Sequence, residues 1–180
     1  MSSKSWSESG IGCYTYQLKC SKNNFWNLIT KANLDKELKK FIVETLGINE
    51  KDYNCYDIDI HPDGTLLYRD TEVNDYDDYF DTSYYGNKAA LEFLALAISN
   101  ELKEKTGDEN TVIYCPSSND GDDAILLRLA APWYYKENNI KVLTQEEYEK
   151  IFQKWFSLYG VAENSNLSNM FYWVDVEQYG

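Results

Sequence analysis

Apolar residues recur every three or four positions in four segments of the chain, at residues 22–32, 34–46, 87–105 and 145–159. This spacing gathers the apolar side chains on one face of an α-helix. Ser21 is a favourable N-cap for the first segment, and Gly47 and Gly107 are favourable residues for ending the second and third. Thr144 and Glu147 have the spacing of a capping box. The pattern therefore predicts four amphipathic helices that pack on a common core.

Shorter segments rich in β-branched and aromatic residues predict strands, at residues 13–16, 53–60, 65–68, 111–115, 124–129 and 170–176. In the second of these, Tyr56, Ile58 and Ile60 alternate with polar residues, so they are expected to share one face. The turn residues His-Pro-Asp-Gly at 61–64 predict a β-hairpin that joins the second strand to the third.

Most of the predicted strands can pair with a neighbour in sequence, which favours antiparallel connections. We therefore predict an α+β fold with a mainly antiparallel sheet of about five or six strands and helices packed on one face. Phe171 and Trp173 are expected to contact the core, whereas residues 1–9, apart from Trp6, are expected to be loose. No linker or repeat interrupts the chain, so we expect a single domain over residues 1–180.

The chain is strongly acidic, with 30 Asp and Glu residues against 17 Lys and Arg and a net charge of −13. This charge argues against direct binding to nucleic acid or to an anionic membrane, because phosphate groups bind clustered Lys and Arg. It suits a basic protein partner, or solubility alone. The glycines form neither a dinucleotide-binding fingerprint nor a P-loop, so no cofactor is expected. The pattern shows no signal peptide and no apolar segment of ~20 residues, so we expect a cytoplasmic protein.

Candidate catalytic and metal-binding residues are few. The four cysteines form no CxxC pair, and we expect them to be buried free thiols. Asp57, Asp59 and His61 share one face of a predicted strand and could hold a divalent metal for phosphoryl chemistry, although a polar row facing solvent is the simpler interpretation. His61 is the only histidine, and no nucleophile motif accompanies it, so no catalytic residue is assigned.

The most unusual stretch, residues 68–85, reads YRDTEVNDYDDYFDTSYY. Its acidic and aromatic residues include Asp70, Glu72, Asp75, Tyr76, Asp77, Asp78, Tyr79, Asp81 and Tyr84. These carboxylates repel one another, yet the stretch has too many aromatics for a solvated tail. We expect a long loop that presents a negative, tyrosine-rich surface. A second acidic cluster, with Asp120, Asp122 and Asp123, could add to the same field or form a solvated turn.

Such a surface can imitate nucleic acid. Carboxylates on a rigid frame can stand in for backbone phosphates, and tyrosine rings can replace stacked bases. Tyrosine is also favoured in interfaces, because it buries a large area at a low entropic cost. The residues therefore predict binding to a basic protein, with the oligomeric state left open.

Two short stretches carry a resemblance. Residues 7–12 (SESGIG), and residues 131–134 (APWY) leading to 143–147 (LTQEE), resemble small phage and mobile-element proteins of Firmicutes, some of which are anti-CRISPR proteins that inhibit Cas9. The resemblance implies an inhibitor, not an enzyme, that occludes the nucleic-acid site of a basic nucleic-acid-binding protein such as Cas9. The alternatives are a metal-dependent enzyme using Asp57, Asp59 and His61, and a phage structural or regulatory protein whose acidity only aids solubility.

Overall fold

Helices and antiparallel strands follow the order that the sequence predicts, with two additional short elements. The computed structural model describes residues 5–69, 79–81, 88–108, 111–117, 122–128 and 132–179. The helices are α1 (Lys22–Ala32), α2 (Asp35–Leu46), α3 (Ala89–Thr106), α4 (Pro132–Glu137) and α5 (Gln145–Tyr159). The strands are β1 (Ser5–Tyr14), β2 (Ile58–Ile60), β3 (Leu66–Arg69), β4 (Tyr79–Asp81), β5 (Val112–Cys115), β6 (Ala124–Leu127) and β7 (Tyr172–Tyr179).

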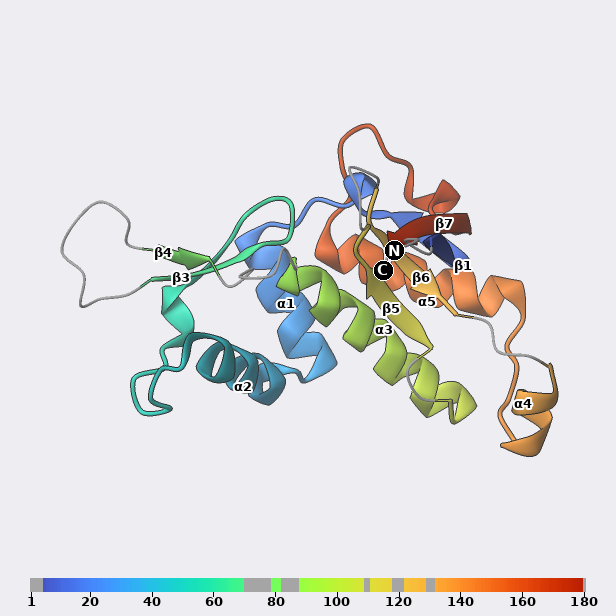
Figure 1. Cartoon of the computed structure of the whole chain (residues 1–180), viewed down its shortest axis with the longest axis horizontal. Coiled ribbons are helices and arrows are strands. Elements are labelled where there is room, and N and C mark those ends of the chain that lie inside the picture. Colours follow the sequence, from blue (N-terminus) through green and yellow to red (C-terminus); the bar gives the residue numbers. More distant parts are fainter. Residues whose placement is uncertain are drawn as a thin grey trace.

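The strands form two antiparallel sheets. One has four strands in the order β5-β6-β1-β7, and the other has three in the order β2-β3-β4. In Figure 1 the three-stranded sheet lies at one end of the molecule and the four-stranded sheet at the other, with α1, α3 and α5 in the middle. The α+β class and the antiparallel pairing are thus confirmed, and the strands are divided between two sheets. None of the helices in the described part of the chain has the length and hydrophobicity that a bilayer span requires.

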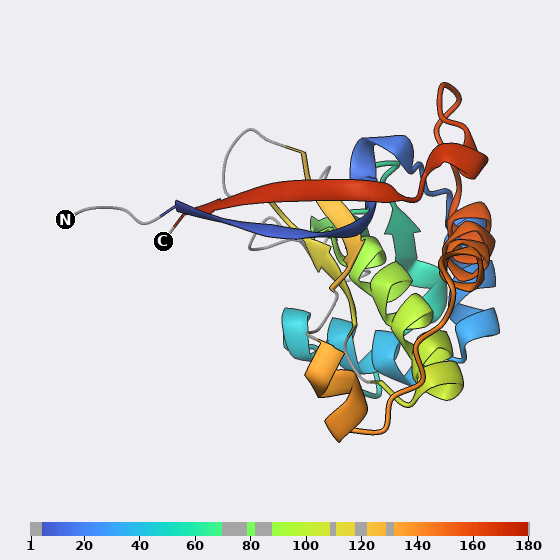
Figure 2. The same cartoon turned by 90° about the vertical axis from the view of Figure 1, so that its right-hand side faces the viewer.

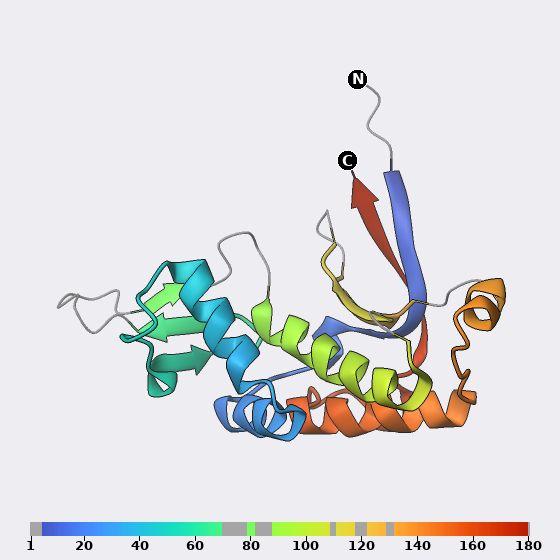
Figure 3. The same ribbon diagram turned by 90° about the horizontal axis from the view of Figure 1, so that it is seen from below.

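Three helices join the two sheets through one hydrophobic core. α1, α3 and α5 pack on one another, and α3 also lies against β5 (Figure 3). The hydroxyl of Ser99 on α3 donates a hydrogen bond to the carbonyl of Val112 at 3.0 Å, which fixes the helix on that strand. Ile58 and Leu66 of the small sheet and Ile125 of the large sheet are fully buried in the same core. Burial of each such side chain contributes about 1.5–3 kcal/mol.

β6 is buried on both faces, because the large sheet curls. Ile125 and Leu127 face the helices, whereas Ala124 and Leu126 face a second apolar cluster with Val174 and others on the opposite side. The outer strands of this sheet are β5 and β7, yet the side chain of Gln178 on β7 donates a hydrogen bond to the carbonyl of Pro116, just after β5, at 2.7 Å. The two edges therefore approach each other and enclose the second cluster.

Several element boundaries differ from the prediction, and long-range pairing explains most of them. β1 starts at Ser5, within the segment expected to be loose, because it pairs with β7 from Ser5↔Tyr179 to Gly12↔Tyr172. The two strands run side by side as a long ribbon in Figure 2. Sequence propensity could not show this pairing, since the partners lie at opposite ends of the chain. Residues 15–16 form part of a short 3₁₀ helix instead of continuing the strand.

Tyr56 and Trp173 lie on the surface, although the sequence predicts Tyr56 on one face with Ile58 and Ile60 and Trp173 in contact with the core. Tyr56 is 84% exposed, because it belongs to a 3₁₀ turn before β2, where the Asn54 side chain accepts a hydrogen bond from its backbone N–H. Trp173 is 59% exposed, because Val174 and Val176 are the β7 residues that face the second apolar cluster. Helix α4 forms in a segment for which the sequence predicts neither a helix nor a strand.

The cysteines are free thiols, as expected, and three of the four are buried. Burial raises the pKa of the Cys13 thiol far above its usual range, and it raises the pKa of Cys20 to about 12. Burial likewise raises the pKa of the Tyr172 hydroxyl to about 12. The folded chain therefore retains protons at alkaline pH that the unfolded chain releases.

β1 can pair on both sides only because it carries glycine at close contacts. A Cβ added to Gly12 would lie 1.9 Å from the Ile125 carbonyl oxygen and 2.8 Å from the Leu126 Cα, both backbone atoms of β6. We expect Gly12→Ala to lower the free energy of unfolding by about 3 kcal/mol or more, since such overpacking cannot relax without moving a strand. Urea denaturation measures the change.

Gly107→Ala is the matched control for that substitution. Gly107 has φ +81° and nothing within 4 Å of an added Cβ. It therefore has only the left-handed backbone penalty, about 1 kcal/mol. Equal losses in the two variants would contradict the close approach of β1 and β6.

The retained protons predict alkaline instability. Stability contributed by a raised thiol pKa is fully present below the pKa of the unfolded thiol, near 9.0, and is lost as the pH rises above it. We expect Cys13→Ala to make the fall in unfolding free energy between pH 9 and 11 shallower by up to about 1.4 kcal/mol per pH unit. Denaturation series at several pH values, in a reducing buffer, test this, and an unchanged slope would show that the thiol does not contribute.

Candidate partner-binding surface

The three-stranded sheet is built on the predicted hairpin. β2 and β3 pair in the register Ile58↔Tyr68, and the turn between them closes with a hydrogen bond from the Gly64 N–H to the His61 carbonyl at 2.9 Å. Gly64 has φ +98°, a left-handed conformation that favours glycine. Its carbonyl accepts a hydrogen bond from the Ala90 N–H at 3.0 Å, which ties the turn to the start of α3. The hairpin prediction is confirmed.

A third strand extends this sheet into the acidic stretch. β4 pairs with β3 in the register Leu67↔Asp81 and Arg69↔Tyr79, so the prediction of an uninterrupted loop is wrong for residues 79–81. Arg69 and Tyr79, which flank residues 70–78 in the sequence, are paired positions of β3 and β4. The sheet itself rests on the core through Ile58 and Leu66, which are fully buried. The small sheet is therefore anchored in the core through β2 and β3.

Most of the predicted binding residues lie outside the described residues. These are Asp70, Glu72, Asp75, Tyr76, Asp77, Asp78, Tyr84 and Asp120. Tyr79 and Asp81 are placed on β4 by their backbone. Asp122 is exposed just before β6.

Asp123 differs from the others, because it faces inward. Its side chain is 15% exposed, and the Lys88 ammonium lies 3.1 Å from Oδ2. The same oxygen accepts a hydrogen bond from the Tyr114 hydroxyl at 2.9 Å, and Oδ1 accepts one from the Ser117 N–H at 2.8 Å. Asp123 thus holds the β5–β6 hairpin against the start of α3 instead of offering a charge to a partner. Sequence reasoning missed Lys88, since nothing local relates it to a carboxylate 35 positions later.

Burial raises the pKa of the Tyr114 hydroxyl above its usual range, and the hydrogen bond to the Asp123 carboxylate raises it further. The hydroxyl therefore stays protonated and donates to Asp123 across the physiological pH range. Tyr114, Asp123 and the Lys88 ammonium form a small polar network that joins the start of α3 to the large sheet.

Lysines on the elements around the small sheet also have carboxylate partners. Lys22 on α1 lies 3.9 Å from Asp59, and Lys39 on α2 lies 2.9 Å from Glu50. The ammonium of Lys39 also sits 5.8 Å from the ring centroid of Tyr53, which stacks on Tyr68 of β3. These cations are therefore engaged locally, whereas residues 70–81 contain six acidic residues and no Lys or Arg.

The metal-dependent alternative gains no support from the described residues. Among them, no group of three His, Cys, Asp or Glu side chains is arranged to hold a metal ion. Asp59 accepts a hydrogen bond from the Ile60 N–H and faces Lys22, whereas the ring of His61 faces Asp63, with Nδ1 3.4 Å from Oδ1. Asp57 belongs to the 3₁₀ turn that precedes β2. The three predicted ligands therefore do not share one strand face.

The His61–Asp63 pair is part of the hairpin turn. Partial burial acts to raise the pKa of Asp63, but hydrogen bonds from Thr65 and the charges of His61 and Lys88 lower it overall. The Thr65 N–H donates to the Asp63 carboxylate at 2.9 Å, which is the usual side-chain bond of an Asp in a turn. These contacts of His61 and Asp63 stabilise the hairpin turn.

Comparisons of the chain with protein-family models, with curated proteins and with solved structures found no match. No family therefore supplies a function or a set of site residues. The resemblance to phage and mobile-element proteins stays a prediction.

The Asp123 network makes a prediction about stability. We expect Asp123→Asn to lower the free energy of unfolding by about 2 kcal/mol, because the Lys88 ammonium loses its partner while the hydrogen bonds to Asp123 lose their charge. Asp122→Asn, at the neighbouring exposed position, should change it by less than about 0.5 kcal/mol. Chemical denaturation measures the free energy of unfolding of both variants. Similar small losses in the two would show that Asp123 has no structural role.

Proposed function

We propose that this chain is an acidic binding protein, without catalytic activity, that acts in the cytoplasm of a host cell. Its partner is a basic nucleic-acid-handling protein, most concretely Cas9, and it inhibits by occupying the site where nucleic acid would bind. The observation that carries the proposal is the concentration of charge in residues 70–81, which hold six carboxylates and no cation and of which residues 79–81 form strand β4 of the small sheet.

The concentration of charge has a physical cost, which a cationic partner removes. Carboxylates a few residues apart repel one another by about 1 kcal/mol per pair at 4 Å even in bulk water, and by more where water is excluded. A groove built to bind phosphates offers clustered Lys and Arg, so it relieves this repulsion on contact. The tyrosines among the carboxylates add apolar area to the same surface.

The proposed surface consists of Asp70, Glu72, Asp75, Tyr76, Asp77, Asp78, Tyr79, Asp81 and Tyr84, with Asp120 and Asp122 as a second patch. Asp123 is left out, because Lys88 neutralises it inside the fold. In Cas9 the protein holds the guide–target duplex in a positively charged channel and reads a short DNA motif directly. Either region would suit an acidic surface of this composition.

Removing the charges of this surface should weaken binding. In one variant, Asp75, Asp77, Asp78 and Asp81 are all replaced by Asn. We expect this quadruple variant to bind the partner with a dissociation constant about tenfold higher or more, because each lost contact is worth up to about 1 kcal/mol. Inhibition of DNA cleavage should fall in parallel. Binding of the unaltered chain should itself weaken as salt rises from low to physiological concentration.

A variant that loses the same charge elsewhere is the control. The control variant replaces four exposed glutamates outside the acidic stretch with Gln: Glu37, Glu104, Glu137 and Glu163. It therefore loses the same number of negative charges as the quadruple Asp variant. This control should keep its affinity within about twofold. Equal weakening by both variants would show that only net charge matters, and no weakening by either would overturn the proposal.

A further inference from the structure

Tyr56 is 84% exposed, more than any other large apolar side chain that the structure describes. It lies in the 3₁₀ turn Cys55–Asp57, directly before β2, and the surface proposed above does not include it. Tyrosine is enriched in protein interfaces, because its ring offers a large contact area together with a polar hydroxyl. A ring this exposed contributes little to the fold, so its faces are open to a partner.

The backbone of this turn is held firmly in place. The Tyr68 hydroxyl on β3 accepts a hydrogen bond from the Asn54 N–H at 3.0 Å and donates one to the Asp52 carbonyl at 3.4 Å. The Asn54 side chain accepts a hydrogen bond from the Tyr56 N–H at 3.2 Å. Because these bonds order the turn before any partner arrives, binding to Tyr56 costs little conformational entropy.

The turn rests on a tyrosine pair that already contacts a cation. Tyr68 is 5% exposed, and its ring stacks on that of Tyr53 with the two centroids 6.5 Å apart. The Lys39 ammonium lies 5.8 Å from the centroid of the Tyr53 ring, within the range of a cation–π contact. The Tyr56 ring offers the same chemistry, and none of the described lysines and arginines lies over it.

Tyr56 lies at the end of the small sheet that carries part of the proposed acidic surface. β2 begins at Ile58 opposite Tyr68, one residue before β3 ends at Arg69. β4 begins opposite Arg69 at Tyr79, which belongs to the proposed surface. The turn that precedes β2 is therefore at the same end of the sheet as Tyr79.

The segment around Tyr56 is negatively charged. Residues 49–60 contain four acidic residues and one lysine. Asp52 and Asp57 lie on either side of Tyr56 in the sequence, and neither forms an ion pair with a described residue. Their charges add to the attraction of this segment for a cation.

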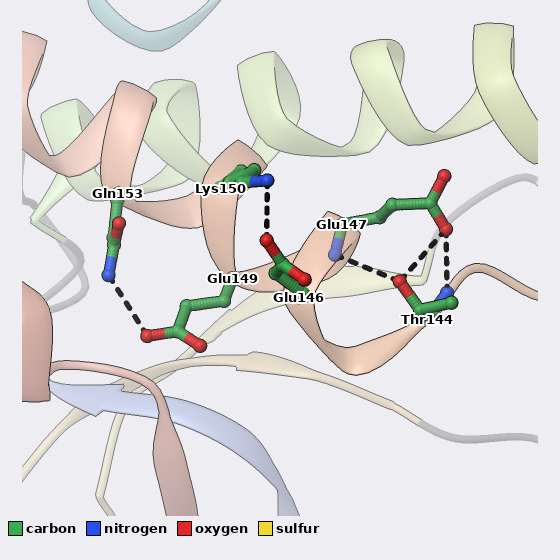
Figure 4. Close-up of polar contacts among 6 residues, drawn as sticks. All are labelled: Thr144, Glu146, Glu147, Glu149, Lys150 and Gln153. Atoms are coloured by element: carbon green, nitrogen blue, oxygen red, sulfur yellow. Dashed lines mark hydrogen bonds and ion pairs between the residues drawn. The ribbon is translucent and has the colours of Figure 1, made fainter.

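Acidic residues of α5, by contrast, are engaged within their own helix. Lys150 lies 2.6 Å from Glu146, and Glu147 accepts a hydrogen bond from the Thr144 N–H at 2.8 Å (Figure 4). The Thr144 hydroxyl accepts one from the Glu147 N–H at 3.3 Å, which confirms the predicted capping box. The side chains of the two aspartates beside Tyr56 make no such contact with a described residue, so their charge is available to a partner.

We propose that Tyr56 binds an arginine side chain of the basic partner, whose guanidinium lies on the exposed face of the ring. The face of a tyrosine ring attracts cations, and a planar, weakly hydrated guanidinium stacks on it better than an ammonium does. A nucleic-acid base could also stack on a tyrosine, but the net charge of −13 repels its phosphates. The inference rests on the proposed function, because it adds one residue and one recognised group to the same binding surface.

Fluorescence anisotropy with labelled nona-arginine and nona-lysine peptides tests the proposal on the full chain. The unaltered chain should bind the arginine peptide about threefold tighter than the lysine peptide, because only the guanidinium stacks well. Tyr56→Leu keeps an apolar side chain but loses the ring, so it should abolish this preference and weaken binding of the arginine peptide by about threefold. Tyr56→Phe keeps the ring, and should retain the preference and the affinity within about twofold.

Tyr16→Leu is the matched control, because Tyr16 is 62% exposed in the 3₁₀ helix that follows β1. It should leave the affinity for the arginine peptide unchanged within about twofold. The urea midpoints of the Tyr56 variants should equal that of the unaltered chain, since the side chain is almost fully exposed. A preference for arginine that survives Tyr56→Leu, an equal loss with Tyr16→Leu, or tighter binding of an oligothymidine than of the arginine peptide would overturn the inference.

The inference and the proposed function can fail separately. Binding of Cas9 by the unaltered chain and by the quadruple Asn variant tests the function alone. An effect of Tyr56→Leu on the arginine peptide, without any binding of Cas9, would overturn the function and leave arginine recognition by Tyr56 in place. Binding of Cas9 together with an unchanged peptide preference in Tyr56→Leu would overturn the role of Tyr56 alone.

Discussion

The pairing of β1 on both sides is the constraint on which the large sheet depends. β1 lies between β6 and β7, so one strand near the start of the chain organises segments more than a hundred residues later. The pairing is possible because Gly10 and Gly12 leave room where the β6 carbonyls come closest. With β6 paired to β1, the large sheet curls so far that the side chain of Gln178 on β7 bonds to the carbonyl of Pro116. The face of the sheet that is turned toward the helices contributes to the main core.

The helical layer separates the two ends of the molecule. The small sheet lies near the start of α3, and the ion pairs of Glu101 with Lys105 and Lys154 lie near its other end (Figure 1). α3 is buried along most of its length, which makes it a rigid spacer between them. At physiological salt the Debye length is about 8 Å, so exposed charges separated by more than that distance act almost independently.

Ion pairs among the described residues identify carboxylates that have a structural role. Asp123 is neutralised by Lys88 inside the fold, and Glu101 by Lys105 and Lys154. By contrast, residues 70–81 contain no cation of their own. Surface ion pairs contribute little to stability, whereas a carboxylate shielded from water needs its partner. The function proposed for the chain rests on the concentration of acidic residues in 70–81 and not on net charge alone.

The sequence by itself determined the features that depend on near neighbours: the four long helices, the Thr144 capping box and the hairpin turn at 61–64. Helical spacing, caps and turn residues act within a few positions, so a linear pattern contains them. Only the tertiary structure decided that β1 begins at Ser5, that Tyr56 faces solvent and that Asp123 faces inward. In these cases the group that accepts a strand's hydrogen bonds, or neutralises a carboxylate, lies far away in the sequence. Such pairs therefore depend on how the whole chain folds, and a local sequence pattern does not contain them.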